Sequence, residues 1–117
     1  MSLSTDSVIA KHRTELIRWM REYMQDTEVA YDENDIARCD ALLAKFLEEI
    51  SAAPDRTSGL QLVKQTVLAL NELNDRCDGE LIETDQREDI CALLARAGHL
   101  RGFNDADEDT TEEWREW

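Results

Sequence analysis

The spacing of the apolar residues is the feature that most limits what this chain can fold into. Two segments of similar length repeat intervals of three and four, the first at Ile36, Cys39, Leu43, Phe46, Ile50 and Ala53, and the second at Leu60, Val63, Val67, Leu70, Asn74 and Cys77. Such intervals place one stripe of side chains along an α-helix. Only a short link around Pro54 separates the segments. The pattern therefore predicts two antiparallel helices, at about 34–53 and 58–76.

Two further helices are expected on either side of this pair. The first, residues 6–25, carries an apolar stripe at Ile9, Leu16, Met20, Tyr23 and Met24. The last is capped by Thr84 or Asp85, with Asp85 and Glu88 spaced as a capping box, and it ends at Gly98. Four Gly and one Pro in 117 residues leave room for few turns. We predict an all-α single domain, an antiparallel four-helix bundle over 1–103, followed by an acidic tail over 104–117.

The charge of the chain is strongly and unevenly negative. There are 13 Lys and Arg against 27 Asp and Glu, a net charge of −14, and most of the excess lies after residue 71. This charge repels nucleic acid and anionic membranes and attracts a basic protein surface or a cation. The one basic segment, with Lys11, Arg13, Arg18 and Arg21, is expected to lie against the acidic half.

The sequence favours a cytoplasmic protein without cofactors. No segment approaches the roughly 20 apolar residues of a membrane span, and residues 1–12 do not resemble a signal peptide. Cys39, Cys77 and Cys91 are odd in number and lack CxxC spacing, which predicts free thiols in a reducing compartment and no zinc site.

No motif for catalysis is present. The chain lacks a Gly-rich phosphate loop, a nucleophile elbow, a metalloprotease motif and the Glu-x-x-His pattern of di-iron bundles. His12 and His99 have no acid or nucleophile partner apparent in the sequence. We therefore predict a protein that is not an enzyme, with no catalytic residues and no metal ligands.

The stretch from Glu72 to Asp89 holds eight carboxylates and two arginines and has two interpretations. Helix caps and a solvated face explain part of it, and a docking surface for a basic partner explains the excess. Trp114 and Trp117, three residues apart, either cover one end of the bundle or anchor a partner. The candidate partner-binding residues are Glu80, Glu83, Asp85, Glu88, Asp89, Trp114 and Trp117.

Other sites are weaker alternatives. Asp105, Asp107, Asp109 and Glu116 match four positions of a calcium loop, but Thr110 stands where that loop needs Gly. A second match, from Asn74 to Asp85, has Arg76 at a ligand position. The asparagines at 71 and 74 are either buried, hydrogen-bonded amides or the lining of a pocket.

Two likenesses bear on function. The run LNELNDRCDGELIETDQREDICALLARAG, with the closing DTTEEWREW, resembles small acidic helical proteins of bacteria whose function is unknown. In size, acidity and helix count the chain is also similar to immunity proteins that neutralise basic nuclease toxins, which implies a protein that inhibits or sequesters a basic partner. The alternatives are a structural or adaptor homodimer and a helical domain that binds a small ligand or cation.

Overall fold

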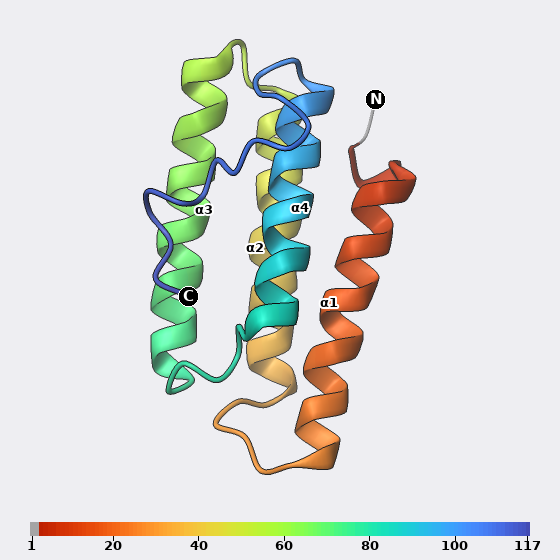
Figure 1. Ribbon diagram of the computed structural model, residues 1–117, viewed down its shortest axis with the longest axis vertical. Helices are drawn as coiled ribbons and strands as arrows, with labels where there is room; N and C mark the ends of the chain where they lie inside the picture. The colour runs from red at the N-terminus through yellow and green to blue at the C-terminus, as the bar shows by residue number, and fades with distance from the viewer. Residues whose placement is uncertain (1–2) are drawn as a thin grey trace.

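The computed structural model describes residues 3–117 and shows four antiparallel α-helices (Figure 1). They are α1 (Ser7–Asp26), α2 (Glu33–Ser51), α3 (Arg56–Arg76) and α4 (Thr84–Leu100), preceded by a 3₁₀ turn at Leu3–Thr5. No strand occurs in the described part of the chain. The prediction of an all-α bundle is confirmed.

Aspartates start the first three helices. The side chains of Asp6, Asp32 and Asp55 each accept a hydrogen bond from the backbone N–H three residues later. Because these N–H groups have no partner within the helix, an acceptor at this position stabilises the helix and sets its first residue.

The start and the end of α4 differ from the prediction. The helix is capped at Glu83, whose backbone N–H donates to Gln86 Oε1 at 3.0 Å, and not by the predicted pair of Asp85 and Glu88. The cause lies on α3, where Asn74 Oδ1 accepts from the N–H of Ile82 at 2.9 Å and holds the connection up to the cap. The predicted end at Gly98 is also wrong, since α4 continues to Leu100.

Gly102 is the glycine that closes α4. Its φ of +76° lies in the left-handed region, which glycine adopts without strain. Gly98 is instead buried inside the helix, where a Cβ atom would collide with the side chain of Asn104. The glycine at 98 therefore serves close packing, and the chain turns four residues later.

The helices pack most closely in two pairs, α1 with α4 and α2 with α3. Both pairs contribute to one core, whose fully buried large side chains include Leu16, Met20, Leu43, Phe46, Leu70 and Ile90. The first helix packs against α4 of the acidic half, as expected, but two of its arginines form ion pairs with a different helix. Arg13 pairs with Asp40 at 2.6 Å and Arg21 with Glu33 at 3.0 Å, so they contact α2 and not the acidic half.

Residues 104–117, which we call the closing segment, run back along α3 without forming a helix (Figure 1). Asn71 of α3 holds it at two points, by donating to the carbonyl of Trp114 at 2.8 Å and accepting from the N–H of Glu116 at 3.1 Å. Thr111 is buried, and its Oγ1 lies 3.3 Å from Cys91 Sγ of α4. Since α3 and α4 contact each other little directly, this segment bridges the seam between them.

Candidate functional site: an acidic groove at one end of the bundle

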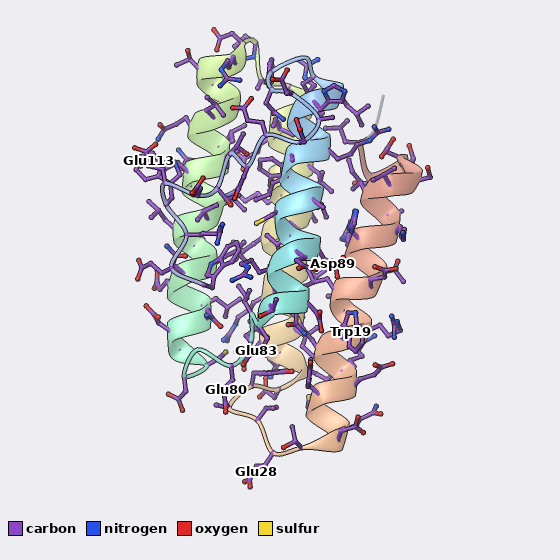
Figure 2. The ribbon with its side chains drawn as sticks, viewed as in Figure 1. Trp19, Glu28, Glu80, Glu83, Asp89 and Glu113 are labelled. Atoms are coloured by element: carbon purple, nitrogen blue, oxygen red, sulfur yellow. The ribbon has the colours of Figure 1, made fainter. Side chains whose placement is uncertain are left out.

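Two connections that are far apart in sequence meet at one end of the bundle. The α1–α2 and α3–α4 connections both lie there, and Figure 2 shows Glu28, Glu80 and Glu83 at this end. Residues 26–35 carry five carboxylates and no Lys or Arg, and residues 75–85 carry five carboxylates and one arginine, Arg76. Both connections therefore bring negative charge to the same end.

A groove of about 430 Å³ opens between these connections. It is lined by Tyr23, Thr27, Glu28, Val29, Glu80, Glu83, Thr84 and Asp85, and we call it the acidic groove. Four of the eight lining residues are carboxylates, and no lysine or arginine of the described chain lines it. A cation that enters this groove meets acceptors from both connections and no competing positive charge.

One hydrogen bond joins the two connections beside the groove, and a second ties the α1–α2 connection to α1. Glu80 Oε2 accepts from the backbone N–H of Ala30 at 2.6 Å, which ties one connection to the other. Beside them, the hydroxyl of Tyr31 donates to the carbonyl of Met20 at 2.8 Å. Burial and the nearby Glu80 and Glu83 carboxylates raise the pKa of Tyr31 to about 12, which keeps this donor protonated.

The predicted acidic residues separate into two groups in the structure. Glu80, Glu83 and Asp85 line the groove together. Glu88 is exposed on α4 outside that lining, and Asp89 is 7% exposed and bonds His12 Nδ1 across the α1–α4 interface at 2.9 Å. Asp89 is therefore an interhelical contact, and a docking partner does not reach it without opening that contact.

The predicted tryptophans lie elsewhere. Trp114 and Trp117 are partly buried against the core, and Lys64 Nζ of α3 lies 4.4 Å from the centroid of the Trp114 ring. Trp117 Nε1 is buried without a hydrogen-bond partner in the described chain. Neither tryptophan lines the acidic groove, and both pack against the core from the closing segment.

Two aromatic residues of α1, Trp19 and Tyr23, lie beside the groove, and neither was predicted to bind a partner. Tyr23 is 37% exposed and lines the groove, and its ring centroid lies 6.2 Å from that of Trp19. Tyr23 was assigned to the core stripe of the first helix. The available signal was the spacing of four between the two aromatics, directly before an acidic connection.

The calcium-loop alternative does not match the geometry of the closing segment. Asp109 accepts hydrogen bonds from Thr111 N and Oγ1, and its Oδ2 lies 3.0 Å from Arg115 Nη2. Burial raises the pKa of Asp109, but these hydrogen bonds outweigh that effect and leave the pKa below its ordinary value. Both oxygens therefore already have partners, and one of those partners is a cation.

Comparison with protein families, with curated proteins and with solved structures finds no match for the chain. Between residues 3 and 117, none of the helices combines the length and the apolar character that a membrane crossing demands.

Proposed function

We propose that this protein is a non-enzymatic binding protein whose acidic groove receives a cationic segment of a basic protein and so inhibits or sequesters it. The observation that carries the proposal is the lining of the groove, where Glu28, Glu80, Glu83 and Asp85 occur with no Lys or Arg among the described lining residues. Carboxylates form strong, often bidentate hydrogen bonds with a guanidinium group. An arginine side chain therefore has several acceptors available at once.

The aromatic edge of the groove supplies the second half of the interaction. Tyr23 and Val29 offer apolar surface next to the carboxylates. A long basic side chain buries its methylene stem on such a surface while its charge stays with the acids, and an aromatic ring attracts a cation over its face. In this mechanism Tyr23 takes the anchoring role that the sequence analysis gave to Trp114 and Trp117.

The net charge favours the encounter itself. A chain with a net charge of −14 attracts a basic partner from a distance and accelerates association. The carboxylates outside the groove, such as Glu88, contribute to this long-range attraction without touching the partner. Direct contact with the partner and long-range attraction therefore depend on different carboxylates. Variants inside and outside the groove distinguish the two effects.

The test uses the double variant Glu28→Gln/Asp85→Asn. Both side chains are exposed and have no hydrogen bond or ion pair in the described chain, so the fold does not depend on them. The matched control is Glu48→Gln/Glu49→Gln, which removes the same charge from exposed positions late in α2. The probe is a short oligoarginine peptide, titrated by calorimetry at about 50 and about 500 mM NaCl, where screening differs strongly.

We expect the groove variant to bind the peptide at least about tenfold more weakly at low salt, since each lost charged hydrogen bond is worth roughly 1.5–3 kcal/mol. The control should keep nearly all of its affinity, and high salt should weaken binding to the wild type. An equal loss in both double variants contradicts the proposal, because binding then follows total charge and not the groove. A peptide affinity that salt leaves unchanged also contradicts it.

A further inference from the structure

A mixed set of metal-ligating side chains lies between α1 and α4, outside the acidic groove. His12 and Glu15 are three residues apart on α1 and share a face. Asp89 comes from α4, where Figure 2 labels it. The potential ligand atoms of these three residues all lie within 4.8 Å of one another. The described chain contains only this one grouping of three such residues.

The distances in this set suit a small divalent cation. Zinc bonds to nitrogen and oxygen are about 2.0–2.2 Å long, which places two neighbouring ligands about 2.9 Å apart at a right angle and about 3.4 Å apart in a tetrahedron. His12 Nδ1 and Asp89 Oδ1 are hydrogen-bonded at 2.9 Å, and a metal ion would take the place of the proton that they share, with a small increase in their separation for a tetrahedral site. Glu15 has three rotatable side-chain bonds with which to close its remaining distance.

The charge of the set is unbalanced without a cation. Glu15 is half-buried and has no hydrogen bond or ion pair within residues 3–117. Two carboxylates therefore face one imidazole, which leaves a net negative charge even when His12 is protonated. Neighbouring like charges repel one another, and a divalent ion bound between them removes that repulsion.

A buried amide near the set is also unsatisfied. Gln86 precedes Asp89 by three residues and so lies on the same side of α4. Its side chain is fully buried, and its Nε2 has no hydrogen-bond partner in the described chain. Buried polar groups are normally paired, so Gln86 Nε2, one helical turn before Asp89, is a donor still free to bind an additional oxygen.

We propose that His12, Glu15 and Asp89 form a site for a transition-metal ion of the zinc type that bridges α1 and α4. An imidazole favours zinc and related ions over magnesium and calcium, which prefer sites made of oxygen alone. Three protein ligands leave a coordination position for water. The site goes beyond the proposed function, since none of its three residues lines the acidic groove.

Calorimetric titration of the full chain with zinc chloride tests the site. The variants are Glu15→Gln and His12→Asn, and the matched control is His99→Asn, which changes the other histidine, an exposed residue near the end of α4. We expect one zinc per chain in the wild type and in the control. Each site variant should bind zinc at least about tenfold more weakly, since even the loss of a residue that supports a ligand costs 10- to 100-fold.

Cobalt provides a second readout, because its visible absorption reports the ligand geometry. The wild type with cobalt chloride should gain an absorption band that Glu15→Gln lacks, and circular dichroism confirms that this variant is folded. Absence of stoichiometric zinc binding in the wild type overturns the proposal. Equal loss in His99→Asn, or unchanged affinity in both site variants, overturns it as well.

Discussion

At the scale of single residues, one aspartate both starts the first helix and ties it to the last helix. Asp6 accepts from the N–H of Ile9 at 3.1 Å, and its two oxygens accept from Arg96 of α4, each at 3.1 Å. The hydrogen bond from Arg96, with that from Ile9, keeps the pKa of Asp6 below its ordinary value of 3.8. The charged form of Asp6 thus stabilises the fold.

This lowered pKa predicts a loss of stability in acid. Because the folded-state pKa of Asp6 is below 3.8, the unfolded state binds the proton first. The stabilisation is complete above about pH 5 and disappears as pH falls through the folded-state pKa. In Asp6→Asn, which keeps a capping oxygen, we expect the free energy of unfolding to fall less between neutral pH and about pH 3 than in the wild type.

Urea denaturation at each pH measures this difference. Asp107→Asn is the control, since Asp107 is exposed and has no ion pair in the described chain. A steep acid loss that Asp6→Asn shares in full with the wild type would assign the effect to other carboxylates.

At the scale of elements, the closing segment 104–117 behaves as a strap between α3 and α4, and Asn71 is its main attachment. We expect Asn71→Ala to lower the free energy of unfolding by about 1–3 kcal/mol, because a buried hydrogen-bonded amide is lost and the groups it paired are left without it. The control is Asn34→Ala, at an exposed position near the start of α2, and it should change the free energy of unfolding little.

The reactivity of Cys91 measures whether the strap stays docked in Asn71→Ala. Cys91 is half-buried and its Sγ contacts Thr111 of the strap, whereas Cys39 and Cys77 are buried, with pKa values that burial raises to about 12 and about 11. In the folded wild type, a thiol reagent should modify Cys91 first. Asn71→Ala should accelerate that reaction, as mass spectrometry can follow, and an unchanged rate would show that the strap stays docked without the amide.

The sequence predicted the α2–α3 pair correctly but misplaced the start of α4. The matched stripes of α2 and α3 predicted an antiparallel pair because burial of one face depends on local spacing alone. The start of α4 was misplaced because Asn74, from another helix, binds the connection at Ile82. The cap at Glu83 thus depends on a tertiary contact that no local pattern contains.

The sequence predicted only part of the candidate site. Glu80, Glu83 and Asp85 belong to one acidic stretch and line one groove. Glu28 and Tyr23 join them only because two connections meet in space. The partner of Asp89, His12, is 77 residues away in sequence, so the burial of this aspartate had no local signal.

At the scale of the whole molecule, net charge works against folding. A value of −14 exceeds the magnitude of about 2–8 that is usual for a small domain, and the resulting repulsion acts on the compact state. Exposed ion pairs such as Arg18 with Glu22, at 3.1 Å, contribute little in return. Salt should therefore stabilise this protein.

We expect the melting temperature at neutral pH to rise when NaCl increases from about 10 to about 500 mM, since screening shortens the range of repulsion from about 30 Å to a few Å. Differential scanning calorimetry measures the shift. Potassium chloride is the control for ion-specific effects and should give the same rise. A melting temperature that falls with salt would mean that the ion pairs outweigh the repulsion.

The strap is synthesised after the four helices, so it is the last part of the fold to dock. A ribosome releases the four helices before it releases residues 111–116, which carry the contacts to Asn71 and Cys91. Domains generally fold as units while the chain emerges from its N-terminal end. The seam between α3 and α4 therefore stays uncovered until the strap docks, so this side of the core is completed last.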